Sequence, residues 1–435
     1  MNIPASMLQR TLTPKLLESA SQYPVVTILG PRQSGKTTLA RALFPSHTYV
    51  DLEDPDLRAL AREDPKTFFA IHPEPLLLDE IQRVPELLSR IKVLVDADRS
   101  RNGRFILTGS HQPRLREAVS QSLAGRTAEL DLLPLSLSEL PAPLDALPTE
   151  DLILRGFLPG LWLDSSPSPA DFHRNYFRTY VERDVRTILE IRHCNAFEKF
   201  LHLLAGRVGQ LVNCDSLAGE VGVSAPTIAQ WLSVAEASFV VFRLPPWFAN
   251  VGKRFVKSPK LYFTDVGLAA WLLGIETPAQ LARDPLRGNL FENLVVAELL
   301  KTRTNAGREP NLYFARDSKG FEVDVLYPRS PIPVPVEIKS ARTFDASFAK
   351  NLNAFSTLLP APNAPPPFSS TTAPPTPPAL ASVASTSATS PPTQSFPWMS
   401  RPDCFSPPFA PAFRRQVQFH SPGKPCNASP KSSSP

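Results

Sequence analysis

The sequence predicts an α/β fold: a parallel sheet with helices on both faces, followed by a helical segment and a second, smaller α/β domain. Short apolar runs alternate with helical patterns across residues 21–145, and strands that alternate with helices form parallel sheets. A glycine-rich turn, Gly30–Thr37, joins the first run to a helix. The second α/β domain is predicted from two later runs, 321–326 and 334–339, in which apolar and charged residues alternate.

The first elements are a helical arm and a buried strand. Leucines at helical spacing predict an arm over residues 1–20, which leads into a strand at 24–29. The turn that follows, Gly30–Thr37, has the pattern G-x-x-x-x-G-K-[ST], the phosphate-binding loop of P-loop NTPases. Its glycines let successive backbone N–H groups point at phosphate oxygens, and the dipole of the following helix adds to the attraction. The sequence therefore predicts a bound nucleoside triphosphate.

Each position of this loop has an expected part in the site. Lys36 is expected to reach the β- and γ-phosphates, and the Thr37 hydroxyl to ligate Mg²⁺. Lys36 therefore counts among the catalytic residues and Thr37 among the metal ligands. The predicted nucleotide-binding residues of this stretch are Gly30, Pro31, Arg32, Gln33, Ser34, Gly35, Lys36, Thr37 and Thr38.

A second strand is expected at 47–52, ended by a turn at Glu53–Pro55, and a third at 75–80. The third is an apolar run that ends in Asp79 and Glu80, which is the Walker B pattern. The carboxyl ends of buried parallel strands open onto the ligand crevice. We therefore expect Asp79 to hold Mg²⁺ through its water shell and Glu80 to polarise the attacking water.

The next helix is expected at 84–97 and the next strand at 104–110. Thr108 or Ser110, at the end of that strand, is a candidate sensor of the γ-phosphate. Arg126 precedes the last strand, 127–133. It is a candidate catalytic arginine finger, which would stabilise charge on the transferring phosphoryl group, but a salt-bridging surface arginine fits the sequence equally well.

These motifs resemble a family of bacterial and archaeal AAA+-type ATPases, in which the ATPase is followed by a C-terminal domain of unknown function, DUF4143. The resemblance covers roughly residues 10–360, and it implies ATP as the nucleotide and Mg²⁺ as the metal. The stretches that carry it are Gly30–Thr37, Leu78–Gln82, Leu107–Ser110 and Leu123–Arg126.

Composition and pattern divide the chain into six expected segments. They are an N-terminal arm (1–20), an AAA+-type ATPase domain (21–145), a helical linker or lid region (146–205), a winged-helix-like segment (206–260), a nuclease-like domain (261–358) and a disordered tail (359–435). The linker region has a long helical pattern at 171–189.

The winged-helix-like segment has two short helices and a strand. The second helix, 225–237, is capped by Ser224, and a strand is expected at 239–242. In a DNA reader this helix would offer base-edge donors, yet its expected exposed residues, Thr227, Gln230 and Ser233, include no arginine. A DNA-binding unit and a packing unit that contacts no DNA both remain open.

The nuclease-like domain rests on four residues. The strands at 321–326 and 334–339 place Asp324 on one strand and Glu337 with Lys339 on the next. Together with Glu292, on a helix at 289–300, they resemble the PD-(D/E)xK nuclease core, a restriction-endonuclease-like fold. Two carboxylates in it would hold Mg²⁺ near a phosphodiester while the lysine activates water. A charged solvent face of a hairpin, or a retained fold without activity, are the alternatives.

The C-terminal segment differs in composition from the rest of the chain. It is rich in Pro, Ser, Thr and Ala, and twenty of the 49 prolines lie from Pro360 onward. Such a segment cannot bury enough apolar surface to offset its ordering entropy, so we expect it to be disordered. Because the change falls inside the predicted sheet, we expect translation in a wrong reading frame, which would leave the sheet with an exposed edge. A genuine disordered linker is the alternative.

The tail also accounts for most of the positive charge. It has five Lys or Arg residues and one Asp, a charge of +4 within the net +5 of the whole chain. The net charge therefore says little about a nucleic-acid surface on the folded part. The four cysteines have no metal-ligand spacing, and no apolar run approaches the length that spans a membrane. We expect a cytoplasmic protein with reduced thiols and no membrane partner.

The sequence therefore predicts a Mg²⁺-dependent ATP hydrolase that is coupled to a C-terminal DNA-interaction or nuclease-like module. A nucleotide-gated DNA-binding switch that does not cleave, and an ATP-gated DNA nuclease, are the alternatives. The nucleotide is the expected partner and DNA a candidate one. Whether the chain forms a homo-oligomer, in which Arg126 would act on a neighbouring subunit, is left open.

Overall fold

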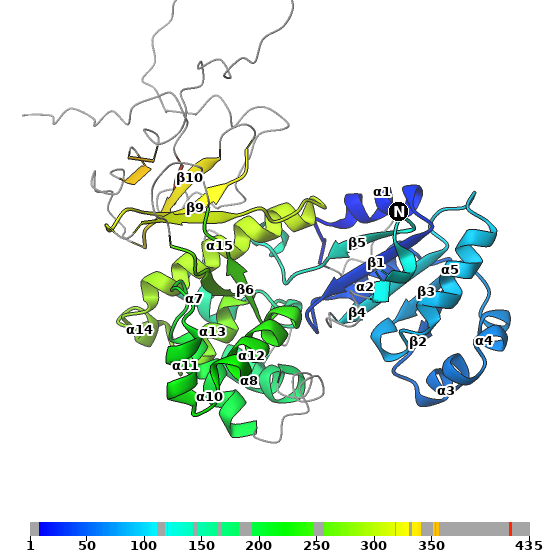
Figure 1. Ribbon diagram of the computed structural model, residues 1–435, viewed down its shortest axis with the longest axis horizontal. Coiled ribbons are helices and arrows are strands. Elements are labelled where there is room, and N and C mark those ends of the chain that lie inside the picture. Colours follow the sequence, from blue (N-terminus) through cyan, green and yellow to red (C-terminus); the bar gives the residue numbers. More distant parts are fainter. Residues whose placement is uncertain are drawn as a thin grey trace, which may run out of the picture.

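The computed structural model describes residues 8–110, 118–119, 121–141, 147–163, 167–181, 194–247, 256–317, 319–329, 333–340, 351–352, 354–355 and 417–419. Figure 1 shows two lobes. We call residues 8–132, drawn in blue and cyan, the N-terminal lobe. Residues 133–355, drawn mainly in green and yellow, form the C-terminal lobe. Among the described residues, no helix is long and apolar enough to cross a bilayer.

The N-terminal lobe is built on a five-stranded parallel sheet in the order β2-β3-β4-β1-β5. Its strands are β1 (Val25–Gly30), β2 (Thr48–Asp51), β3 (Leu76–Asp79), β4 (Phe105–Ser110) and β5 (Thr127–Asp131). Strands β1, β3 and β4 are buried along their whole length, which explains their continuous apolar runs. The predicted parallel sheet is confirmed.

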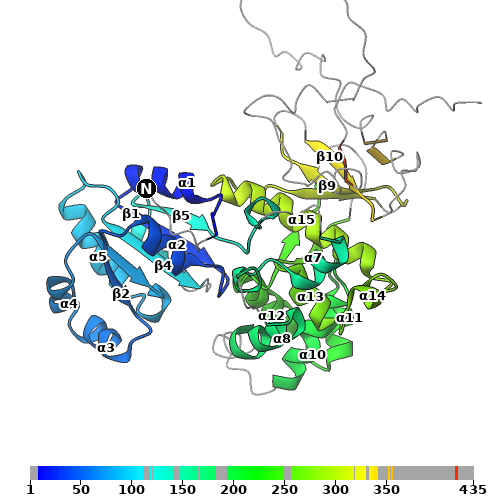
Figure 2. The same cartoon turned by 180° about the vertical axis from the view of Figure 1, so that it is seen from behind.

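Helices cover both faces of this sheet, as predicted. They are α1 (Thr13–Gln22), α2 (Lys36–Leu43), α3 (Pro55–Glu63), α4 (Pro65–Ile71) and α5 (Leu87–Ala97). Alternate residues of β1 enter two different cores: Val26 packs with α1 and α2, and Val25 packs with α3, α4 and α5. Figure 2, from behind, shows the sheet between the two sets of helices.

Helices α3 and α4 both begin at Asp-Pro steps. The first of these, Asp54–Pro55, was predicted only as a turn, and no element was predicted at the second. The Asp54 side chain accepts hydrogen bonds from the N–H groups of Asp56 and Leu57, and Pro55 occupies the first helical position. Asp64 and Pro65 start α4 in the same way. An Asp cap followed by proline is therefore a helix start here, because the proline nitrogen would have no partner in the first turn anyway.

The C-terminal lobe is mainly helical around one continuous core that extends from Leu133 to Ile338. Its helices are α7 (Thr149–Arg155), α8 (Pro169–Tyr176) with a π-helical turn (Phe177–Val181), α10 (Cys194–Ala205), α11 (Cys214–Val221), α12 (Ala225–Ala237), α13 (Val266–Leu272), α14 (Pro278–Leu281) and α15 (Arg287–Asn305). The long helix predicted at 171–189 changes to a π-helical turn at Phe177, and its last residues lie outside the described ranges.

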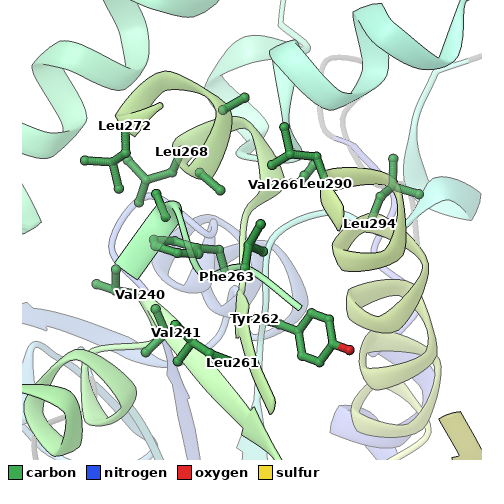
Figure 3. Packing of buried hydrophobic residues seen from close by; sticks show 14 of the residues in the cluster. Val240, Val241, Leu261, Tyr262, Phe263, Val266, Leu268, Leu272, Leu290 and Leu294 are labelled. Carbon is green, nitrogen blue, oxygen red and sulfur yellow. The ribbon is translucent and has the colours of Figure 1, made fainter. Parts of the chain in front are cut away.

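A small antiparallel sheet lies in the middle of this core. Strands β6 (Val241–Leu244) and β7 (Lys260–Phe263) pair in it. Figure 3 shows Leu261 and Phe263 of β7 among apolar side chains, and Tyr262 directed toward the helix that carries Leu290 and Leu294, which is α15.

The predicted helix pair of the winged-helix-like segment forms α11 and α12. Gly222 adopts a left-handed conformation at the end of α11, with φ of 89°. The Ser224 side chain accepts the Thr227 N–H at the start of α12, as the predicted cap requires. The strand expected at 239–242 begins only at Val241, because Phe239 has a positive φ of 55° and cannot join a ladder.

A four-stranded antiparallel sheet in the order β11-β10-β9-β8 completes the C-terminal lobe. Its strands are β8 (Tyr313–Arg316), β9 (Glu322–Tyr327), β10 (Val334–Ile338) and β11 (Val417–Phe419). The two predicted strands are β9 and β10. The expectation of an exposed edge at β10 was wrong, because β11, from the predicted tail, pairs with it. The other residues of 359–435 lie outside the described ranges.

Candidate functional site

The phosphate-binding loop lies between β1 and α2, at the carboxyl edge of the parallel sheet. A Cβ atom at Gly30 would lie 2.2 Å from the Leu132 carbonyl oxygen, so this position requires glycine. Gly35 starts α2 in a left-handed conformation with φ of 89°. The buried Lys36 ammonium donates to the carbonyl oxygens of Gly30 at 3.1 Å and Pro31 at 2.8 Å. The lysine is thus held inside the loop that the motif predicts.

The Walker B aspartate meets the end of this loop. The Thr37 hydroxyl donates to Asp79 at 2.8 Å, and the Tyr49 hydroxyl donates to the same carboxylate at 3.1 Å. Thr108 also donates to Asp79, because β4 and β3 are neighbours in the sheet. Burial and the Asp79 carboxylate raise the pKa of Tyr49 above its ordinary range. A threonine hydroxyl and a carboxylate side by side are the two protein oxygens that a phosphate-bound Mg²⁺ would use.

Among the described residues, no group of three His, Cys, Asp or Glu side chains forms a metal cage. That is consistent with Mg²⁺ in a nucleotide site, since Mg²⁺ keeps several waters and takes the rest of its ligands from phosphates and from one or two protein oxygens. Thr37 and Asp79 fit that requirement by chemistry and by position.

Glu80 lies beside Ser110 at the same edge of the sheet. Glu80 has a left-handed backbone with φ of 55°, and its carboxylate accepts hydrogen bonds from Gln82 and, at 3.5 Å, from the Ser110 hydroxyl. Of the two sensor candidates, Thr108 thus contacts Asp79, and Ser110 contacts Glu80. Both roles stay predictions.

Arg126 lies at the amino ends of the strands, opposite the end that carries the phosphate loop. It precedes β5, its carbonyl oxygen accepts the Val25 N–H, and β5 runs parallel to β1. Its guanidinium pairs with Asp96 through two contacts of 2.8 Å and holds the pKa of that carboxyl at about 2. Arg126 therefore lies away from the phosphate loop of its own chain, because that loop is at the opposite end of the strands. A role as an arginine finger on a neighbouring subunit stays a prediction. The surface salt bridge is what the structure contains.

A buried arginine that no sequence pattern indicated, Arg10, lies behind the loop. Arg10 donates to the carbonyl oxygens of Ser34 and Leu133, each at 2.6 Å, and pairs with Glu139 at 3.3 Å. Burial lowers the pKa of Arg10, although Glu139 opposes this effect. No motif contains Arg10, and its partners lie up to 129 positions away (139 − 10). The only feature of the sequence that could have pointed to Arg10 as a functional residue was its position in a short arm before the first strand.

A small pocket of about 120 Å³ lies beside Arg10, where α2 leaves the loop. It is mainly apolar, and the loop residue Gly35 forms part of it. The residues that line it are Leu8, Arg10, Gly35, Thr38, Leu39, Leu135, Pro159 and Leu163.

The C-terminal lobe contacts the phosphate loop directly. The Tyr176 hydroxyl, at the end of α8, donates to the Arg32 carbonyl oxygen at 3.4 Å. Phe239 packs against the cores of both lobes. These contacts join α8 and Phe239 to the N-terminal lobe.

A second connection extends from Arg10 to helix α15. Glu139 closes a turn by accepting the Ser136 N–H at 2.8 Å, and the neighbouring Leu137 N–H donates to Glu298 of α15 at 2.8 Å. Lys301 of α15 donates to Glu298 and to the Leu135 carbonyl oxygen, each at 2.8 Å. These buried polar contacts link the phosphate loop to the longest helix of the C-terminal lobe.

The structure brings together the four residues of the predicted nuclease-like site. Lys339 lies 2.7 Å from Glu337 and 3.7 Å from Asp324, and Asp324 accepts the Ile338 N–H at 2.8 Å. Glu292 joins the group through Lys260, which lies 3.0 Å from Glu292 and 3.8 Å from Asp324. Lys260, Tyr262 and Glu322 belong to the same cluster and were missed, because they precede or flank the two motif strands.

Burial dominates the electrostatics of this cluster. It raises the pKa of Glu337 to about 7, and the neighbouring Asp324 contributes to the shift. It also raises the pKa of Glu292. The Glu337 Oε2 atom has no hydrogen-bond partner within the described ranges. The carboxyl groups of this cluster outnumber its two ammonium groups, Lys260 and Lys339.

Helix α12 faces the N-terminal lobe with part of its surface. Ser233 and Glu236 line a cavity of about 740 Å³ that Asp131 of β5 also lines. Arg243 pairs with Glu236 rather than remaining available for phosphate. DNA binding by this helix stays a prediction, and two of its basic neighbours, Lys253 and Arg254, lie outside the described residues.

Three family models match successive parts of the chain. An AAA domain matches residues 22–141, a domain of unknown function (DUF8612) matches 148–279, and a second one (DUF4143) matches 287–368. Together with the loop and Asp79, these matches define the class of protein as a P-loop ATPase of the AAA type. The chain belongs to the family of AAA-type ATPases that carry a C-terminal DUF4143 domain.

Three proteins that are similar in sequence to this chain have names that describe no function. An uncharacterized protein of Mycobacterium tuberculosis, Rv2008c, is 33% identical over 352 residues, which cover 80% of this chain and 76% of the relative. An uncharacterized protein of Mycobacterium bovis, Mb2031c, matches to the same extent. An uncharacterized protein of Haemophilus influenzae is 26% identical over 243 residues, which cover 52% of this chain and 57% of that protein.

Two solved structures are similar to parts of the chain. The Walker-type ATPase PABY2304 of Pyrococcus abyssi is 18% identical with a TM-score of 0.40, over 61% of this chain and 96% of that one. A STAND protein with a tetratricopeptide repeat sensor, PH0952 of Pyrococcus horikoshii, is 11% identical with a TM-score of 0.22, over 70% of this chain and 48% of that one.

Proposed function

We propose that this protein hydrolyses ATP with Mg²⁺ and that its nucleotide state controls the C-terminal lobe. The observation that carries the hydrolytic part is the contact of 2.8 Å between the Thr37 hydroxyl and Asp79, with Glu80 next in sequence. The loop, the metal-binding oxygens and the candidate base meet at one edge of the sheet, which is the arrangement that phosphoryl transfer needs.

Each residue of this site has a separate role in the proposed hydrolysis. Lys36 exchanges its contacts with the loop carbonyls for the β- and γ-phosphate oxygens. Thr37 and Asp79 hold the Mg²⁺ ion, which neutralises charge on the phosphates when it is bound. Glu80 accepts a proton from the attacking water, and the Ser110 hydroxyl orients the Glu80 carboxylate.

The pocket beside Arg10 is the proposed place for the base of the nucleotide. It is continuous with the loop through Gly35 and Thr38, and its lining is largely aliphatic. Apolar walls with a few polar groups are typical of small-molecule and cofactor sites. We expect the Arg10 guanidinium to keep the wall in position through its contacts with Ser34 and Leu133.

Two variants test the hydrolytic proposal. Lys36→Ala should abolish ATP binding, because it removes the cation that faces the phosphates. Glu80→Gln should bind ATP as the wild type does and lose at least about 100-fold in turnover, the usual contribution of a general base. Binding is measured by calorimetry and turnover by phosphate release. Equal turnover of Glu80→Gln and wild type would refute the assignment of Glu80.

A second candidate function is that the lobe controlled by ATP acts on DNA. It is supported by the gathering of Glu292, Asp324, Glu337 and Lys339 in one cluster. A nuclease would cut supercoiled DNA in the presence of Mg²⁺ and ATP, and Asp324→Ala would not. A non-cleaving switch would instead bind DNA with an affinity that falls with salt and changes with ATP. Equal cleavage by both proteins would indicate a contaminating nuclease.

A further inference from the structure

A lysine that the nuclease pattern does not contain lies among its carboxylates. Lys260, the first residue of β7, is 2% exposed, although its strand precedes the nuclease-like sheet in the sequence. Its ammonium lies 2.7 Å from Glu322, 3.0 Å from Glu292 and 3.8 Å from Asp324. One ammonium group thus faces three carboxyl groups that come from α15 and β9.

Further donors from the same chain bind other oxygens of this cluster. Tyr262, two residues along β7, donates its hydroxyl to Glu292 at 2.5 Å, in the direction that Figure 3 shows. Lys339 pairs with Glu337 at 2.7 Å, and the Ile338 N–H donates to Asp324 at 2.8 Å. Two ammonium groups, one phenol and one amide therefore already bind this cluster.

These residues do not fit a divalent cation. Mg²⁺ needs an octahedron of oxygens at about 2.0–2.1 Å, with room for its own waters. Here Glu292, Glu322 and Asp324 are arranged around the Lys260 ammonium, which occupies the place that a metal ion and its waters would take. Burial by itself would lower the pKa of Lys260, but Tyr262 and the carboxylates more than offset it and raise that pKa well above the ordinary value. Lys260 therefore stays positively charged.

We propose that the Lys260 ammonium takes the place of the divalent cation that the nuclease resemblance implies. The cluster is then a permanent ion network that joins β7 to α15 and β9, and the lobe does not cleave phosphodiesters through a bound metal. This inference goes beyond the proposed ATPase function and decides against the nuclease alternative. The charges of this cluster then serve to hold two sheets on one helix.

One consequence follows from the charges. Removing a partner from a buried ion network leaves uncompensated charges. We expect a cation from solution to offset them. In Lys260→Met the stem of the side chain is retained, but Glu292, Glu322 and Asp324 lose their common counter-ion. This variant is expected to gain a divalent-cation site that the wild type lacks.

The test is a titration of full-length, nucleotide-free protein with Mn²⁺, followed by calorimetry and by electron paramagnetic resonance. We expect Lys260→Met to bind one Mn²⁺ ion more than the wild type, and Lys260→Met with Asp324→Asn to lose that ion again. Lys257→Met is the matched control, because Lys257 is an exposed lysine three positions earlier, and it should behave as the wild type does. No extra Mn²⁺ in folded Lys260→Met would overturn the proposal.

If Lys260→Met does not fold, a second comparison tests the proposal that Lys260 replaces the divalent cation. Wild type and Asp324→Asn should bind equal amounts of Mn²⁺, since the lysine already occupies the wild-type cluster. Loss of a Mn²⁺ ion in Asp324→Asn would overturn the proposal. Neither arm contains nucleotide, so failure of the ATPase proposal would leave these results unaffected.

Discussion

Arg10 and Lys260 are buried cations, each of which faces several acceptors far away in the sequence. Neither residue belongs to a motif, and a lysine or an arginine in a sequence is ordinarily exposed. The sequence pattern could assign functional residues only within a short motif, such as Lys36 and Thr37 in the phosphate loop. The sequence left two roles open for Arg126, because the choice depends on which end of the strand it occupies.

Arg10 should be essential for stability, unlike Arg126. Arg10→Met leaves Glu139 buried without its counter-ion and is expected to lower the free energy of unfolding by about 3 kcal/mol or more. Arg126→Ala removes only a surface pair and should cost less than about 1 kcal/mol, with an unchanged rate of ATP hydrolysis. Urea unfolding measures the stability of the two variants, and phosphate release measures the rate of ATP hydrolysis. An Arg10→Met protein as stable as the wild type would contradict the assignment.

Glu337 should make stability depend on pH. Its pKa of about 7 in the folded protein exceeds the ordinary value of 4.5, because burial favours the neutral form. This group therefore stabilises the fold fully below about pH 4.5, and that contribution is lost as the pH rises through 7. Glu337→Gln should flatten the stability profile between those values in urea unfolding at several pH values. An unchanged profile would show that Glu337 titrates normally.

At the scale of elements, the order of strands and helices in the N-terminal lobe could be predicted, since buried parallel strands have continuous apolar runs. Helix α3 was missed because Asp54–Pro55 was interpreted as a turn, although Asp-Pro also starts helices, and no prediction was made for the second such step at α4. In the C-terminal lobe the helix pair α11–α12 was predicted from its cap and its glycine. The pairing of β11 with β10 could not be predicted, because its sequence separation leaves no local signal.

The junction of β1 and the phosphate loop should tolerate no side chain. In Gly30→Ala the new methyl group would meet the Leu132 carbonyl oxygen at 2.2 Å, so the loop must move and ATP binding should fall at least about tenfold, equal to 1.4 kcal/mol. Gly219→Ala on α11 is the control. Its methyl group meets nothing within 4 Å, and it should raise stability by about 0.5–1 kcal/mol through helix propensity. Unchanged ATP affinity in Gly30→Ala would contradict this reading of the loop.

At the scale of the whole molecule, the two lobes meet at the site where nucleotide is expected. Tyr176 contacts the loop carbonyl of Arg32, and Arg10 connects the loop to α15 through Glu139. Helix α15 carries Glu298 near the N-terminal lobe and Glu292 in the ion network with Lys260. The network would let α15 and the outer sheet respond as one body to a movement that starts at the loop.

Hydrogen–deuterium exchange of the Glu80→Gln protein, with and without ATP and Mg²⁺, tests this account most directly. The variant holds the bound state, because it binds ATP and turns it over slowly. We predict that ATP slows exchange in the phosphate loop and also changes it in α8 and the π-helical turn, residues 169–181. Helix α14, which packs against α7, should stay the same. Tyr176→Phe should weaken the effect in 169–181 alone. Protection confined to the phosphate loop, with no change in 169–181, would contradict control of the C-terminal lobe by nucleotide.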